Sequence, residues 1–283
     1  MDIKNVTVIG GGTMGNGIAH VFAQKNFTVN LVEMNEELFK RAITTITKNL
    51  DRQIKKEIIT EDDKKNTLSR ISKIIGVENT PAGSDLVIEA IYENKDAKLN
   101  IFNKLLQTVK PDSIFASNTS SISITELSAN AKPDKFIGMH FMNPVPMMKL
   151  VEIIRGYSTS DTTFNTVKDL ALKLGKTPVE VFDYPGFISN RILMPMINEA
   201  IFALMEGVAS AADIDTVMKL GMNHPMGPLT LADFIGLDVC LAIMNVLYTG
   251  FNDPKYRPCP LLKKMVAANK LGRKNGEGFF KYE

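Results

Sequence analysis

His140 and Glu152 are the residues of this sequence best suited to acid–base chemistry. His140 lies near the end of the apolar run 136–141, a turn NPVPMM follows, and Glu152 lies in the next apolar run. If the two runs form an antiparallel hairpin centred on Pro146, His140 and Glu152 lie opposite each other on one face. The carboxylate would then orient the imidazole, which could accept the hydroxyl proton of a secondary alcohol. The alternative is a strand histidine that is merely hydrogen-bonded.

A glycine-rich turn near the amino terminus has the GxGxxG pattern of a dinucleotide site. Its residues are Gly10, Gly11, Gly12, Thr13, Met14 and Gly15. The turn follows the apolar run NVTVIG and precedes a helical pattern, so its small residues could bring backbone NH groups against a pyrophosphate. Glu33 ends the next apolar run, where a carboxylate can bind ribose hydroxyls. The alternative is a tight strand–helix turn followed by an ordinary surface acid.

The charge of Glu33 also bears on which dinucleotide is bound. A carboxylate at this position repels the additional phosphate of NADP, so the sequence predicts NAD. Arg41 argues in the other direction, because it could approach a 2′-phosphate if its helix were suitably turned.

These residues need a parallel sheet to position them, and the first 183 residues have the corresponding pattern. Short β-branched runs alternate with helical patterns, which is typical of βαβ units and predicts an α/β Rossmann-type domain. The predicted strands are 5–10, 27–33, 84–90, 113–117, 136–141, 149–154 and 177–182.

Residues 35–70 depart from a compact βαβ unit. Apolar residues recur at near-helical spacing, the segment ITEDD follows, and a second helical stretch comes next, which together predict an inserted helical hairpin. The first helix carries four basic side chains, namely Lys48, Arg52, Lys55 and Lys56. They form either a solvated face or a site for an anionic ligand.

The pattern changes after Asp183. Tyr184, Pro185 and Gly186 interrupt it, and the following segments are apolar and helical, such as RILMPMINEAIFALMEG. The sequence thus predicts an NAD-binding Rossmann-like domain over residues 1–183 and an all-α domain over residues 184–283.

Composition excludes several classes of protein. A net charge of +2 on 283 residues gives no domain-wide positive field for nucleic acid. The two cysteines, Cys240 and Cys259, fit a reducing compartment, and no signal segment or membrane-spanning apolar run is evident. The three histidines lack partners at zinc spacing, so we expect no metal. These features predict a cytoplasmic protein without membrane or nucleic-acid partners.

Seven segments in order resemble the L-3-hydroxyacyl-CoA dehydrogenase family, and within it the bacterial 3-hydroxybutyryl-CoA dehydrogenases. They are VIGGGTMGNGIA, DLVIEAIYEN, ASNTSSISIT, GMHFMNPVPMMKLVEII, PGFISNRIL, MKLGMNHPMGPL and GRKNGEGFFKY. The resemblance spans essentially the whole chain. It implies a two-domain enzyme that interconverts (S)-3-hydroxybutyryl-CoA and acetoacetyl-CoA with NAD, within fatty acid and butanoate metabolism. It also implies a homodimer joined through the helical domains.

The resemblance assigns roles position by position. His140 matches the catalytic histidine and Glu152 its acidic partner, while Ser120 and Asn190 match residues that hold the substrate oxygen and thioester. A hydroxyl and an amide suit a carbonyl on which charge develops. The remaining matches are to cofactor contacts at Glu93, Lys98, Ser120, Asn143 and Lys274, and to coenzyme A contacts at Asn49 and Lys56.

Two other functions compete with this one. A dehydrogenase of the same fold could act on a free hydroxy acid or sugar acid, although it would have little use for the basic hairpin. A non-catalytic NAD-binding protein could keep the fold without activity, although the intact set of Ser120, His140, Glu152 and Asn190 argues against it. The acyl-chain length and the physiological direction stay open.

Overall fold

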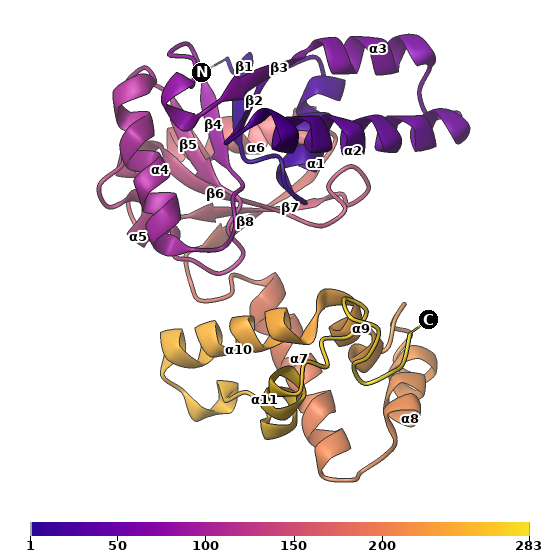
Figure 1. The fold of residues 1–283 in the computed structure, drawn as a ribbon. Helices are drawn as coiled ribbons and strands as arrows, with labels where there is room; N and C mark the ends of the chain where they lie inside the picture. The colour runs from indigo at the N-terminus through magenta and orange to yellow at the C-terminus, as the bar shows by residue number, and fades with distance from the viewer. Residues whose placement is uncertain (1, 283) are drawn as a thin grey trace. The chain divides into compact units, whose positions relative to one another are not determined.

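The computed structural model describes residues 2–282 and divides the chain into two compact units, Met1–Asp183 and Tyr184–Glu283. Each unit is described by itself. The first is a mostly parallel sheet with helices, and the second is helical, as the ribbon shows (Figure 1). The predicted fold class is therefore confirmed.

The first unit is built on one eight-stranded sheet in the order β3-β2-β1-β4-β5-β6-β7-β8. Its strands are β1 (Asn5–Ile9), β2 (Thr28–Glu33), β3 (Ile71–Ile75), β4 (Leu86–Glu89), β5 (Ile114–Ser117), β6 (Phe136–Phe141), β7 (Leu150–Arg155) and β8 (Thr177–Phe182). All neighbours pair in parallel except β6 and β7, which are antiparallel. The switch point of this order, between β1 and β4, is where open α/β sheets bind ligands.

Strand β3 was not among the predicted strands. It is an edge strand that pairs only with β2, and its residues Ser72 and Lys73 are exposed. A short, half-exposed segment directly after a helix lacks the continuous apolar run of a buried strand, so periodicity does not mark it.

Helices cover both faces of the sheet. They are α1 (Gly15–Gln24), α2 (Glu36–Lys55), α3 (Glu61–Ser69), α4 (Lys95–Thr108), α5 (Ile124–Ser128) and α6 (Asp161–Lys173), with short 3₁₀ turns at Val77–Asn79 and Pro133–Lys135. Helices α1 and α6 share one core cluster with Ile88, Ala116 and Met139 of the strands. On the other face, Phe102 of α4 packs against Phe115 and Phe136.

The two faces follow from the alternation of side chains along each strand. Because Ile88, Ala116 and Met139 point toward α1 and α6, the next residue of each strand points toward α4 and α5. Those next residues are Glu89, Ser117 and His140. The polar residues at the carboxyl ends of β4, β5 and β6 therefore share one face.

The predicted helical hairpin is present as α2 and α3, which lie side by side (Figure 1). Asn35 caps α2 by accepting a hydrogen bond from the NH of Leu38, and Thr60 with Asp63 forms a capping box on α3. The buried residues of α2 form a single stripe, Ala42, Ile46 and Leu50, which belongs to the same core as α1. The rest of α2 is left for solvent or for a ligand.

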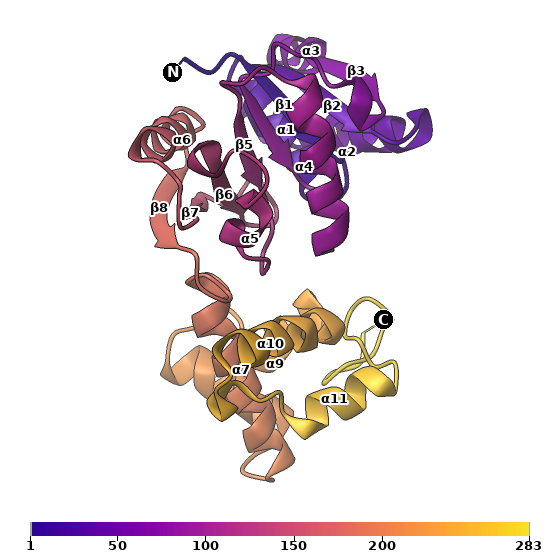
Figure 2. The ribbon, with the colours of Figure 1, turned by 90° about the vertical axis from the view of Figure 1, so that its left-hand side faces the viewer.

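The second unit contains α7 (Ser189–Met205), α8 (Ala211–Thr216), a π-helical segment (Val217–Gly221), α9 (Pro228–Ile235), α10 (Leu237–Phe251), a 3₁₀ turn (Pro254–Tyr256) and α11 (Pro260–Ala267). Figure 2 shows its helices at a right angle to the first view. The buried Asp233 of α9 accepts hydrogen bonds from the NH groups of Phe279 and Phe280. These bonds fix the carboxyl-terminal segment to α9.

Residues 2–282 contain neither a single membrane-spanning helix nor a metal-binding cluster. No single helix in this range has the length and apolar character to cross a membrane, although α9 and α10, bent by 99° at their junction, meet these criteria together. In the same range, no group of three or more His, Cys, Asp and Glu side chains is arranged to hold a metal ion.

Candidate active site

The predicted pairing of His140 and Glu152 is confirmed. The two residues are directly opposite in the β6–β7 register, and the Nδ1 atom of His140 lies 2.7 Å from Oε2 of Glu152. Both are buried, Glu152 with 2% and His140 with 9% of their surface exposed. A carboxylate at Nδ1 holds a proton on that nitrogen and makes Nε2 the acceptor of the neutral ring. The dyad is thus arranged for a proton to be exchanged at Nε2.

The glycine-rich turn joins β1 to α1 in the way that a dinucleotide site requires. Gly10 has φ of +91°, a conformation that favours glycine, and its NH binds the carbonyl of Val32 at 2.9 Å. A Cβ on Gly15 would collide with the carbonyl oxygen of Gly10. A Cβ on Gly12 would meet no protein atom within 4 Å, so the turn presents its backbone to open space at the start of α1.

A cavity of about 460 Å³ adjoins this turn. Glu33 lines it from the end of β2, with Oε1 accepting a hydrogen bond of 2.6 Å from the NH of Gly11. Arg41 and Asn143 line it as well. Backbone NH groups at a helix start suit a pyrophosphate, and a carboxylate beside them suits ribose hydroxyls. The residues present therefore fit NAD, and Met14 is the N-cap of α1.

A second cavity, of about 900 Å³, lies against α1, α2, α3 and the loop after β6. Its lining includes four basic side chains, Lys25, Arg52, Lys56 and Arg70, and one acidic side chain, Asp63. The Asp63 carboxylate accepts hydrogen bonds from Thr60 within the capping box. The excess of positive charge favours the anionic-ligand interpretation for Arg52 and Lys56, whereas Lys48 and Lys55 lie outside this lining.

The two cavities adjoin. Asn49, Pro144 and Pro146 line both of them, so the loop between β6 and β7 forms a shared wall. The buried Lys176 supports this loop, because its Nζ donates hydrogen bonds to the carbonyl oxygens of Val145 and Met148 at 2.5 and 2.6 Å. An NAD and a second, anionic molecule could thus bind next to each other within the first unit.

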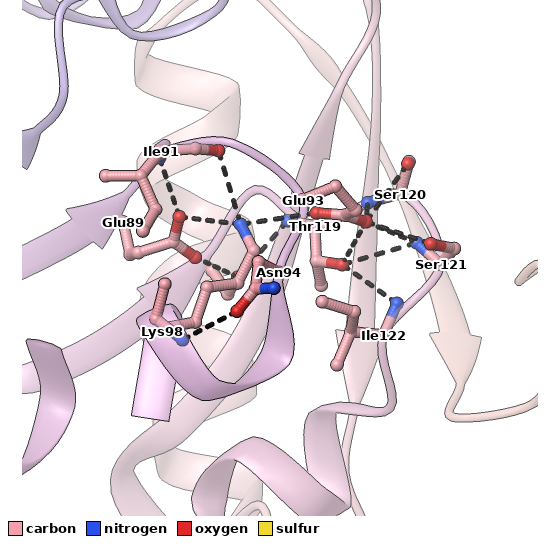
Figure 3. A network of polar contacts seen from close by, with 11 residues as sticks. Glu89, Ile91, Glu93, Asn94, Lys98, Thr119, Ser120, Ser121 and Ile122 are labelled. Carbon is pink, nitrogen blue, oxygen red and sulfur yellow. Dashed lines mark hydrogen bonds and ion pairs between the residues drawn. The ribbon is translucent and has the colours of Figure 1, made fainter. Parts of the chain in front are cut away.

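Ser120 lies in a loop after β5 that Glu93 holds (Figure 3). Oε1 of Glu93 accepts hydrogen bonds from the NH and the hydroxyl of Ser120, at 2.9 and 3.2 Å. Burial alone would raise the pKa of Glu93, but the Lys98 ammonium and the donors of residues 119–121 outweigh it and lower that pKa.

Lys98 lies beneath this loop, with 1% of its side chain exposed. Its ammonium is 2.6 Å from Oε1 of Glu89 and 3.3 Å from Oε2 of Glu93. Burial raises the pKa of Glu89, against the opposing effect of the ammonium. The resemblance makes Lys98 a cofactor contact, whereas here its ammonium lies between two carboxylates.

Two residues with predicted roles belong to the second unit. Asn190 is buried at the start of α7. The Nζ atom of Lys274 lies 2.7 Å from a carboxylate oxygen of Asp238, and the side chain is half-exposed. Their roles beside His140 stay predictions.

Three residues that organise the site were not predicted from the sequence: Glu89, Asn118 and Lys176. Glu89 ends the buried strand LVIE, and a charged residue inside such a run is a signal that it needs a buried partner. The side-chain oxygen of Asn118 accepts a hydrogen bond of 3.0 Å from the NH of Phe141, next to His140. Nothing local in the sequence marks Asn118 or Lys176.

Known proteins resemble this chain over its full length. A family model described as 3-hydroxyacyl-CoA dehydrogenase, NAD binding domain, matches residues 5–184, and the model of the C-terminal domain matches residues 186–282. A probable 3-hydroxybutyryl-CoA dehydrogenase of Deinococcus radiodurans is 58% identical over 97% of this chain and 99% of its own length. The 3-hydroxybutyryl-CoA dehydrogenase of Bradyrhizobium diazoefficiens is 54% identical over 99% and 96%.

A solved structure agrees with these relatives. The (S)-3-hydroxybutyryl-CoA dehydrogenase of Ralstonia eutropha superposes with a TM-score of 0.97 and 52% identity, covering 100% of both chains. The two family models, the close relatives and the fold lead to the same result. The chain belongs to the 3-hydroxyacyl-CoA dehydrogenase family and is an NAD-binding dehydrogenase.

Proposed function

We propose that the protein interconverts (S)-3-hydroxybutyryl-CoA and acetoacetyl-CoA with NAD(H). The observation that carries the proposal is the buried His140–Glu152 dyad, with 2.7 Å between Nδ1 and Oε2, in a chain of this family. The similarity to the 3-hydroxybutyryl-CoA dehydrogenases of Bradyrhizobium diazoefficiens and Ralstonia eutropha supports the four-carbon substrate.

The chain's own residues manage the proton and the orientation of the substrate. Bound NAD would supply the hydride chemistry at C3. In the oxidative direction Nε2 of His140 accepts the proton of the C3 hydroxyl, and the Glu152 carboxylate stabilises the imidazolium that forms. In the reductive direction His140 returns that proton to the oxygen of the ketone. The hydroxyl of Ser120 donates its single proton to Glu93 in this structure and would turn it to the substrate oxygen when substrate binds. The amide of Asn190 would donate to the thioester.

The binding roles follow the two cavities of the first unit. Gly10, Gly12, Thr13, Met14 and Gly15 would hold the cofactor phosphates and Glu33 the ribose, with further contacts from Glu93, Ser120, Asn143 and Lys274. The side chain of Lys98 is 1% exposed and lies between Glu89 and Glu93, so it would act on the cofactor only through Glu93. Asn49 and Lys56 hold the phosphates of coenzyme A. The basic lining of the larger cavity supports a CoA thioester over a free hydroxy acid, because a free acid has no phosphates for these cations to bind.

The substrate class can be tested by comparing two ketones as oxidants of NADH. We expect acetoacetyl-CoA to be reduced with a kcat/KM at least a hundredfold above that of acetoacetate, because only the thioester brings the CoA phosphates to the basic cavity. An equal or higher kcat/KM for acetoacetate would instead favour a dehydrogenase of free hydroxy acids.

We further propose that the protein is a cytoplasmic homodimer joined through its second unit. The two free cysteines support the compartment. Exposed apolar side chains of the second unit, among them Val217, Leu220 and Met222, support a partner surface there.

A further inference from the structure

A chain of polar contacts, buried at Glu89 and Lys98 and more exposed at Glu93, runs from β4 to the loop that carries Ser120 (Figure 3). Its starting point is Glu89, the last residue of β4, which has no exposed surface. Neither the glycine turn nor the His140 dyad includes Glu89. Burying a carboxylate costs free energy unless the group is paired and hydrogen-bonded. The partners of Glu89 therefore indicate its structural role.

Both oxygens of Glu89 are fully engaged. Oε1 accepts hydrogen bonds from Nζ of Lys98 at 2.6 Å and from the NH of Ile91 at 2.7 Å. Oε2 accepts one from the hydroxyl of Ser117, at the end of β5, at 2.6 Å. One carboxylate therefore joins the ends of two strands to the first turn of α4.

Lys98 connects Glu89 to Glu93. It follows the N-cap Asn94 by one turn and shares a buried stripe of α4 with Phe102 and Leu105, so its ammonium points at the sheet. A cation near the amino terminus of a helix interacts unfavourably with the helix dipole. A buried ammonium in this position therefore needs anionic partners. Lys98 finds two, Glu89 on one side and Oε2 of Glu93 on the other.

Glu93 then holds the Ser120 loop with its second oxygen. Five donors converge on Oε1, and they are the NH and hydroxyl of Ser120, the NH and hydroxyl of Ser121, and the hydroxyl of Thr119. Asn118 ties the same loop to the NH of Phe141, the residue after His140. The loop is therefore fixed from both ends, with Glu93 on one side and strand β6 on the other.

We propose that Glu89 is a positioning residue, which fixes Ser120 through Lys98 and Glu93 and so sets the place of the Ser120 hydroxyl relative to strand β6. Without the Glu89 carboxylate, the ammonium of Lys98 loses its hydrogen bond to the sheet. Lys98 then no longer holds the Glu93 carboxylate in a single orientation. The inference rests on the proposed function where it concerns turnover. Where it concerns the order of residues 118–122, it stands without it.

A double-mutant cycle with Ser120→Ala tests the proposal through activity. We expect Glu89→Gln to lower kcat/KM for NADH and acetoacetyl-CoA about tenfold, and to lower it less than about threefold in the Ser120→Ala background. Equal losses in the two backgrounds, or a Glu89→Gln rate within twofold of wild type, would overturn it. Ser117→Ala removes one bond to Glu89 without unpairing a charge, and we expect it to lower kcat/KM about threefold; an unchanged rate would count against the proposal.

Asp85→Asn is the matched control, because Asp85 pairs with Lys110 at the other end of the same strand. We expect it to lower the melting temperature while kcat/KM stays within twofold of wild type. A tenfold loss there would show that any broken ion pair on β4 impairs turnover, and the specific position of Glu89 would lose its support.

Amide hydrogen exchange separates this inference from the proposed function. We expect Glu89→Gln to speed exchange in a peptide covering residues 118–122 and to leave residues 5–9 of β1 protected, since the NH groups of Ser120 and Ser121 bind Glu93. Unchanged protection at 118–122 would overturn the inference even in an active enzyme. A wild type that does not oxidise NADH with acetoacetyl-CoA would overturn the function alone.

Discussion

A histidine opposite a carboxylate on neighbouring antiparallel strands is the smallest unit that explains the chemistry of this protein. The register of β6 and β7 places His140 beside Glu152, and burial of both keeps the hydrogen bond of 2.7 Å away from water. A carboxylate in this position orients the ring and stabilises its protonated form. In the proposed mechanism the dyad therefore leaves Nε2 of His140 as the nitrogen that exchanges the proton with the substrate.

His20 is a second buried histidine, of a different kind. It has no exposed surface, and within residues 2–282 its ring nitrogens have no hydrogen-bond partner. Burial, and secondarily the charge of Lys176, lower its pKa from 6.5 to about 4. The neutral ring thus belongs to the folded state, and His20 is part of the core rather than of the chemistry.

This difference predicts an acid-sensitive stability. Neutral His20 makes its full contribution to the free energy of unfolding above pH 6.5. This contribution is lost as the pH falls toward 4, because in that range the His20 ring binds a proton only in the unfolded chain. We expect the loss to approach about 3 kcal/mol, and urea unfolding of wild type and His20→Leu at pH 7.5 and pH 4.5 measures it. Between pH 7.5 and pH 4.5, the free energy of unfolding should fall less in His20→Leu than in wild type, by about this amount. Equal decreases in the two proteins would refute a neutral, buried His20.

At the scale of elements, the helical hairpin supplies the basic cavity. Lys56 follows the end of α2 and lines that cavity, whereas the neighbouring Lys55 does not. We expect Lys56→Gln to raise KM for acetoacetyl-CoA about tenfold and to leave KM for NADH unchanged, because one charged hydrogen bond to a phosphate is lost. Steady-state kinetics of Lys56→Gln and of the control Lys55→Gln measure this. Equal increases of KM for acetoacetyl-CoA in the two variants would indicate that the general positive charge of the helix, and not a specific site at Lys56, attracts the substrate.

The loop between β6 and β7 is the second element with a testable part. Lys176 holds it through two carbonyl oxygens, and the loop lines both cavities. Lys176→Met should therefore raise KM for NADH and for acetoacetyl-CoA together, each about fivefold, as two bonds to the shared wall disappear. The exposed Lys173 provides the control, since Lys173→Met should change neither constant. An increase confined to one substrate would mean that the loop is not a common wall.

Elements with a strong local period were predictable from the sequence, and the partners of single buried charged residues were not. The turn centred on Pro146 determined the predicted strand register, because residues equally distant from Pro146 lie opposite each other in an antiparallel hairpin. The half-exposed strand β3 has no such period. Lys98 looks like any lysine at the start of a helix, and only the folded sheet brings Glu89 and Glu93 to its ammonium. Buried ion pairs depend on tertiary contacts that no local pattern encodes.

For the whole molecule, the open question is assembly. Leu220 of the second unit has 80% of its surface exposed, and Val217 and Met222 are exposed beside it in the sequence. Solvent-exposed apolar groups of this kind fit a partner surface. We expect light scattering to give twice the chain mass of 31.3 kDa for wild type and the single chain mass for Leu220→Asp.

Tyr157 of the first unit, which is 93% exposed, provides the control for this experiment. Tyr157→Asp should keep the doubled mass, because the first unit is not the expected contact. A wild type of 31.3 kDa, or a doubled mass in Leu220→Asp, would contradict an assembly through this surface.

The most direct test of the account is the rate of NADH oxidation by acetoacetyl-CoA in wild type and His140→Gln, with NADH affinity measured alongside. The account predicts that the variant binds NADH within about threefold of wild type and loses at least about a thousandfold in kcat, since the proton donor is removed while the glycine turn and Glu33 remain. Comparable rates in the two proteins would contradict the assignment of His140, and with it the proposed mechanism.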